Sequence, residues 1–149
     1  MKPVITWVVV ADGARAKVYL NDGPGRGLAE IPGAELAGAH AATRDINADR
    51  PGRTFDSAGV GRHAKEPPTD AHREAKRKFA RLVAALLQDG LNRAAYDRLV
   101  LVAPPQALGD LRRELGKGVQ AKVSGELGKD LTHLPGHELP EHLATLLAV

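Results

Sequence analysis

The chain has 149 residues, of which 43% are hydrophobic and 3% aromatic, and it contains no cysteine. This length fits one globular domain with an aliphatic core, and the lack of cysteine excludes disulfides, thiolate catalysis and cysteine-ligated zinc. The formal net charge of +3 is mildly basic, which permits an anionic partner without requiring one. We therefore expect a single domain over residues 1–149.

The apolar run near the N-terminus, Val4 to Val10, is too short for a membrane span and is poorly flanked for a secretory signal. No other stretch of the sequence approaches the roughly 20 apolar residues that a membrane-spanning helix needs. We therefore expect a soluble, cytoplasmic protein without membrane insertion.

The first forty residues predict β-structure. The β-branched run Val4–Val10 is typical of a strand that is buried on both faces. The pair Asp12-Gly13 predicts a hairpin turn into an antiparallel strand over Ala16–Leu20. Residues Leu28–Leu36 predict a third strand, weakened by an internal Pro-Gly pair. Together these segments predict a β-meander.

Residues 38–68 have almost no apolar periodicity. An irregular stretch of this length inside a domain is uncommon and is usually functional or disordered, so we expect a long flexible loop. Its glycines, Gly59 and Gly61, indicate either a backbone nest for an anion or simple flexibility. They match neither a P-loop nor a dinucleotide fingerprint, so no nucleotide cofactor is expected.

Residues 70–89 predict an amphipathic helix that Gly90 ends. Apolar residues recur along it at spacings of three and four, and we expect Phe79 to be buried where the helix crosses the sheet. The predicted apolar stripe contains Ala71, Ala75, Phe79, Leu82, Val83, Leu86 and Leu87.

Arg73, Arg77 and Arg81 recur every four residues, which predicts one basic ridge beside the apolar stripe of this helix. Such a ridge suits contacts with phosphate groups. The alternative is a solvated helix face on which Glu74 and Lys78 pair across one turn.

The second half of the chain alternates strand and helix patterns. Residues 99–103 predict a buried strand, and Pro104-Pro105 begins a helix that Gly116 and Gly118 end. Residues 123–127 predict an edge strand, and residues 140–147 a closing helix. Strands at both ends of the chain with helices between them predict an α/β domain with a mixed β-sheet flanked by helices.

Metal and catalytic patterns are sparse. The oxygens between Asp45 and Asp56 are spaced like a calcium loop, but Arg50 stands where that loop needs glycine. The histidines show no recognised ligand spacing, so no metal site is expected. His63 and His72 remain as candidate general bases.

Three segments together resemble the bacterial host-attachment protein family, and the resemblance covers essentially the whole chain. They are Trp7–Ala16, Gly52–His63, and Thr69–His72 with Phe79-Ala80. That family is similar in turn to the central domain of archaeal and eukaryotic peptide-chain release factors. The resemblance implies a mixed sheet flanked by helices, of the type shared with ribonuclease H and ribosomal protein S11.

In those release factors a Gly-Gly-Gln tip, on the loop before a long helix, reaches the peptidyl-tRNA ester. The corresponding place here carries Gly59-Val60-Gly61-Arg62-His63, and the loop contains no glutamine. This departure argues against a peptidyl-tRNA hydrolase-like enzyme and favours a non-catalytic protein.

The leading hypothesis is an accessory factor that associates with RNA or the ribosome, with tRNA or ribosomal RNA as its partner. The candidate RNA- and anion-binding residues are Arg53, Gly59, Gly61, Arg62, His63, Lys65, Arg73, Arg77 and Arg81. The rival hypothesis is a structural or signalling module that binds another protein and affects attachment to host cells indirectly. A third is a hydrolase that uses His63 or His72.

Overall fold

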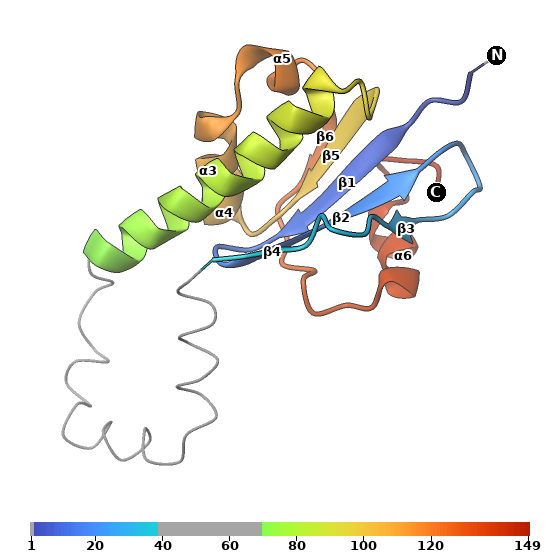
Figure 1. Ribbon diagram of the computed structural model, residues 1–149. Coiled ribbons are helices and arrows are strands. Elements are labelled where there is room, and N and C mark those ends of the chain that lie inside the picture. The colour runs from blue at the N-terminus through green and yellow to red at the C-terminus, as the bar shows by residue number, and fades with distance from the viewer. Residues whose placement is uncertain (1, 39–69) are drawn as a thin grey trace.

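The structure is a computed structural model that describes residues 2–38 and 70–149. Among these residues six strands form one sheet, in the order β3-β2-β1-β5-β6, with β4 also paired to β2 (Figure 1). The strands are β1 Thr6–Ala11, β2 Arg15–Asn21, β3 Ala29–Glu30, β4 Leu36–Ala37, β5 Arg98–Val102 and β6 Val123–Leu127. The helices are α3 Asp70–Asn92, α4 Pro105–Glu114, α5 Lys117–Gln120, the 3-10 helix Gly136–Glu138 and α6 Leu139–Leu143.

The predicted N-terminal hairpin is confirmed. β1 and β2 pair antiparallel, and a carboxylate oxygen of Asp12 accepts the backbone N–H groups of Ala14 and Arg15, both at 2.7 Å. The predicted third strand is two short strands instead, β3 and β4, each paired to β2. They are separated because Gly33, with φ of 81°, turns the chain between them.

Two parallel pairings complete the sheet and make it mixed, as predicted. β1 pairs with β5, and β5 pairs with the edge strand β6. The crossover that leads into β5 contains α3, and the crossover from β5 to β6 contains α4 and α5. Both crossovers step in the same direction along the sheet, and connections of this kind share one handedness, so the three helices lie on the same face. The C-terminal segment with α6 covers the other face.

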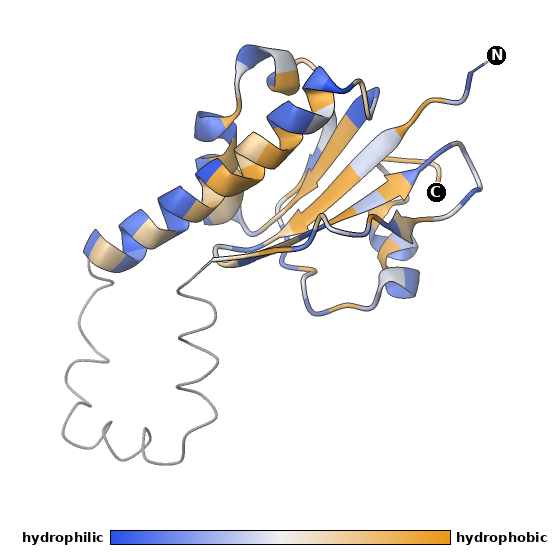
Figure 2. Ribbon diagram, viewed as in Figure 1, coloured by the Kyte–Doolittle hydropathy of each residue, from blue (hydrophilic) through white to orange (hydrophobic). Residues whose placement is uncertain are grey.

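Each face of the sheet carries its own hydrophobic cluster. Trp7, Val9 and Leu101 point toward the α3–α4 side, whereas Val8, Val10 and their neighbours on β5 pack against the C-terminal segment. Figure 2 shows this hydrophobic centre on the strands, with hydrophilic residues along the N-terminal turns of α3. The alternation follows from strand geometry, which sends successive side chains to opposite faces.

The long helix was predicted in the right place, and Phe79 is buried as expected. Leu82 was assigned to the apolar stripe, but its side chain is 52% exposed. Gly90 does not end the helix. It lies inside α3 and is buried, and a larger residue would not fit there because a Cβ on Gly90 would lie only 2.7 Å from the ring of Trp7.

α3 ends instead at a capped turn. The N–H of Ala95 donates to the carbonyl of Gly90, and the N–H of Ala94 donates to that of Leu91. This is a Schellman arrangement, whose terminal position takes the left-handed conformation and usually carries glycine. Here Ala94 holds that position, with φ of 54°.

The C-terminal elements differ from the prediction in detail. Gly118 does not end a helix but lies within the four-residue helix α5. The predicted closing helix over residues 140–147 is the shorter α6, and its Leu143 is fully buried while Leu147 packs beyond the helix end. Within residues 2–38 and 70–149, no helix combines the length and the hydropathy of a membrane span.

Candidate nucleic-acid interface

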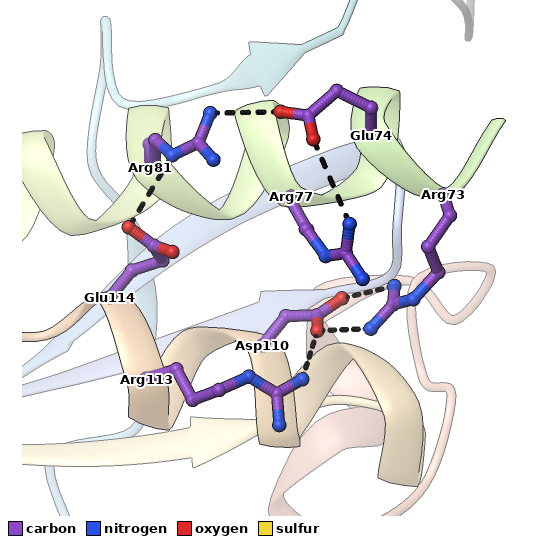
Figure 3. Close-up of polar contacts among 7 residues, drawn as sticks. All are labelled: Arg73, Glu74, Arg77, Arg81, Asp110, Arg113 and Glu114. Atoms are coloured by element: carbon purple, nitrogen blue, oxygen red, sulfur yellow. Dashed lines mark hydrogen bonds and ion pairs between the residues drawn. The ribbon is translucent and has the colours of Figure 1, made fainter. Parts of the chain in front are cut away.

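The predicted basic ridge lies on the side of α3 that faces α4 (Figure 3). Arg73, Arg77 and Arg81 come from successive turns of α3, as their four-residue spacing requires, and α4 runs alongside. We call the solvent side of these two helices the α3–α4 surface. Its exposed cations include Arg77, Lys78, Arg81 and Arg113, whereas Arg73 lies where the two helices meet.

Arg73 is not a surface cation of the kind that the sequence pattern suggested. Its two terminal nitrogens donate to the two carboxylate oxygens of Asp110, at 2.7 and 2.5 Å. Asp110 is only 3% exposed and Arg73 23%, so the pair is largely withdrawn from water. A bidentate pair of this kind joins α3 firmly to α4.

Asp110 has a second guanidinium partner. Arg113, one turn further along α4, donates to it at 2.6 Å from a largely exposed side chain. The hydrogen bonds from Arg73 are the main reason that the pKa of Asp110 is lowered, with a smaller contribution from Arg113. The same bonds raise the pKa of Arg73, so both groups stay charged over the physiological range.

The other two ridge arginines are half exposed and pair with carboxylates. Glu74 contacts Arg77 at 3.7 Å and Arg81 at 3.2 Å, and Arg81 also reaches Glu114 at 3.6 Å. The expected pairing of Glu74 with Lys78 is therefore replaced by pairings with arginines on the ridge itself. Exposed ion pairs of this type are each worth only about 0–1 kcal/mol.

Charge is distributed unequally between the two faces of the sheet. Residues 70–122, which form α3, β5, α4 and α5, contain eleven Lys or Arg and six Asp or Glu. Residues 123–149, which form β6 and the C-terminal layer, contain one Lys and four Asp or Glu. The helical face is therefore the basic one, although its arginines sit beside acidic residues.

The remaining sequence candidates divide into two groups. His72 lies exposed in the first turn of α3. The others lie outside the described residues, and the structure does not place them: Arg53, Gly59, Gly61, Arg62, His63 and Lys65. The predicted loop over residues 38–68 and the calcium-like spacing between Asp45 and Asp56 also lie outside, apart from Gly38.

The described residues form neither a substrate cleft nor a metal centre at the junction of the Asp12-Gly13 turn with α3 and α4. The cavity there, lined among others by Lys76, Phe79 and Asp110, has a volume of about 10 Å³, which is enough for one water. Among the described residues no three His, Cys, Asp or Glu side chains gather as metal ligands would.

Asp110 is the residue that sequence reasoning missed. A faint signal exists, because Asp110 directly precedes Leu111 on a helix whose apolar residues face the core. A carboxylate at the border of an apolar stripe needs a partner when buried, since lone charges are rarely buried. The identity of that partner, 37 residues away, has no local sequence signal.

Comparisons with known proteins give a similar solved structure and a family match. The structure is similar to the crystal structure of an archaeal translation termination factor, with a TM-score of 0.47 and 13% sequence identity. The similarity covers 89% of this chain and 32% of that one, so the chain spans about a third of that protein. No curated protein matches the chain. Residues 7–143 match the family described as "Protein required for attachment to host cells", and the chain therefore belongs to this host-attachment family.

Proposed function

We propose that this protein is a non-catalytic accessory factor that binds RNA, free or in the ribosome, through the α3–α4 surface. The observation that carries the proposal is the charge asymmetry: the basic excess is concentrated on residues 70–122, whereas the opposite layer is acidic. A polyanion would be steered toward the basic face and repelled from the other. Contacts with backbone phosphates supply most of such binding.

The burial of each ridge arginine decides which of them can contact phosphate. Arg77 and Arg81 are about half exposed, and their pairs with Glu74 are weak, so a phosphate can replace the carboxylate at little cost. Lys78 is exposed one position after Arg77 and has no ion-pair partner among residues 2–38 and 70–149. Arg73 instead holds Asp110, and we assign it a structural role.

The stretch of sequence that precedes α3 is the second part of the proposal. It carries glycines and cations at positions 53–65, shortly before the first residue of α3. We propose that they extend the phosphate contacts of Arg77 and Arg81 along the same RNA.

The test removes three charges from the α3–α4 surface in the variant Arg77→Gln/Lys78→Gln/Arg81→Gln. The matched control, Lys17→Gln/Arg26→Gln/Lys129→Gln, removes three positive charges elsewhere on the protein. Binding of fluorescently labelled bulk tRNA and of a ribosomal RNA fragment is followed by anisotropy over a range of salt concentrations. Each lost phosphate contact should reduce the steepness of the plot of log affinity against log salt concentration by slightly less than about one unit.

We expect weaker binding and a flatter slope in the α3–α4 variant, and little change in the control. Equal losses in both variants would mean that net charge, and not this surface, determines binding. Unchanged affinity and slope in the α3–α4 variant would overturn the proposal and favour a module that binds another protein.

A further inference from the structure

The aromatic side chains that the structure describes are withdrawn from the surface. The chain has five aromatic residues, and the four that the structure describes are at most 5% exposed: Trp7, Tyr19, Phe79 and Tyr96. The fifth, Phe55, lies outside the described residues. Trp7 and Tyr96 contact each other with ring centroids 4.8 Å apart, and the Tyr96 hydroxyl donates to the Leu87 carbonyl. These rings belong to the core.

This burial restricts the form of RNA that the α3–α4 surface can bind well. Proteins recognise unpaired bases largely by stacking them on exposed aromatic rings, which contributes about 1–3 kcal/mol per base. Among the described residues, the α3–α4 surface offers no Phe, Tyr or Trp ring for such stacking. A single strand would gain phosphate contacts alone, and ordering that flexible strand would oppose binding.

The cations of this surface, in contrast, are mounted on rigid elements. Arg77 and Arg81 lie one helical turn apart on the 23-residue helix α3, which corresponds to about 6 Å along its axis. α4 adds Arg113 beside them, and the Arg73–Asp110 pair holds the two helices together. A preformed row of cations suits a preformed row of phosphates, because neither side must be ordered on binding.

We infer that the α3–α4 surface binds double-helical RNA through its sugar-phosphate backbone, without reading the base sequence. Double-stranded RNA is recognised mainly by shape, by phosphates and by 2′-hydroxyl groups, and none of these needs an aromatic platform. The inference rests on the proposed function and specifies the class of RNA that it involves.

The experiment compares three labelled probes with the full-length chain by fluorescence anisotropy. They are an RNA duplex of about 20 base pairs, an unstructured single-stranded RNA of the same length, and a second duplex of unrelated sequence. At about 50 mM salt we expect the first duplex to bind at least about fivefold more tightly than the single strand, and the two duplexes within about twofold of each other. Arg77→Gln/Lys78→Gln/Arg81→Gln should weaken duplex binding, and Lys17→Gln/Arg26→Gln/Lys129→Gln should not.

Each other outcome has a distinct meaning. Equal or tighter binding of the single strand would overturn the inference and leave the proposed function standing. A difference above about tenfold between the two duplexes would show base readout and would also overturn it. Absence of binding to every probe would overturn the proposed function itself, and the inference with it.

Discussion

Replacing Arg73 with alanine is expected to lower the free energy of unfolding by about 2–4 kcal/mol. Arg73 supplies two of the three guanidinium hydrogen bonds that the buried carboxylate of Asp110 receives. Removing one partner of a buried ion pair typically costs about 3–5 kcal/mol. The loss should fall at or somewhat below the lower end of that range, because Arg113 remains as a partner from the exposed side.

Two single variants provide the comparison. Arg77→Ala removes the same side chain from the next turn of α3, but its pair with Glu74 is half exposed and 3.7 Å long, so the cost should stay below about 1 kcal/mol. Arg113→Ala should also cost less than about 1 kcal/mol, since its side chain is 65% exposed. Combining Arg73→Ala with Asp110→Ala should give a coupling energy of about 1–3 kcal/mol.

The measurement is urea denaturation at pH 7, followed by circular dichroism, with the m-values required to agree between variants. If Arg73→Ala proves no more destabilising than Arg77→Ala, the assignment of Arg73 to a structural role is wrong. A coupling energy near zero would mean that Arg73 and Asp110 do not stabilise the fold through each other.

Three further predictions concern stability. The pKa of Asp110 is lowered from its usual 3.8, so its stabilising contribution is complete above that pH and is lost as the pH falls through the lower folded-state pKa. In Asp110→Asn, the unfolding free energy should therefore fall less steeply below about pH 4 than in the unmodified protein. Thr6→Val should raise the unfolding free energy by about 1 kcal/mol, since the buried Thr6 hydroxyl has no hydrogen-bond partner among the described residues, and a lower melting temperature would contradict this. Ala94→Gly should stabilise by about 0.5–1 kcal/mol by relieving the left-handed backbone conformation, and calorimetry that finds a loss would count against strain at that residue.

The sequence predicted the fold well where one local pattern determined the outcome. A β-branched run predicted β1, a short apolar run predicted β5, and the Asp12-Gly13 pair predicted the first hairpin. The sequence did not predict features that depend on a contact with a distant residue. Glycine often ends a helix, but Gly90 instead makes room for Trp7, and no pattern near Gly90 reveals that contact.

The candidate site was predictable to a similar degree. The four-residue spacing of the ridge arginines indicated correctly that they share one side of α3, because helical periodicity depends only on local sequence. The spacing did not reveal which arginine is buried, since that depends on Asp110 of another helix. Leu82 was misassigned for a related reason: α3 buries residues 79–80, 83–84 and 87, and Leu82 lies off that row.

The parallel pairing of β1 with β5 has a consequence for how the chain reaches this fold. Thr6 is aligned with Arg98, and just before them the N–H of Ile5 donates to the Asp97 carboxylate across 92 residues of sequence. The β1–β2 hairpin can form as soon as its own residues exist, whereas the second edge of β1 must wait for β5. During synthesis, Val8 and Val10 therefore lack most of their core neighbours until over two-thirds of the chain has been made. The slow step of folding should accordingly be the docking of β5 onto a hairpin that formed much earlier.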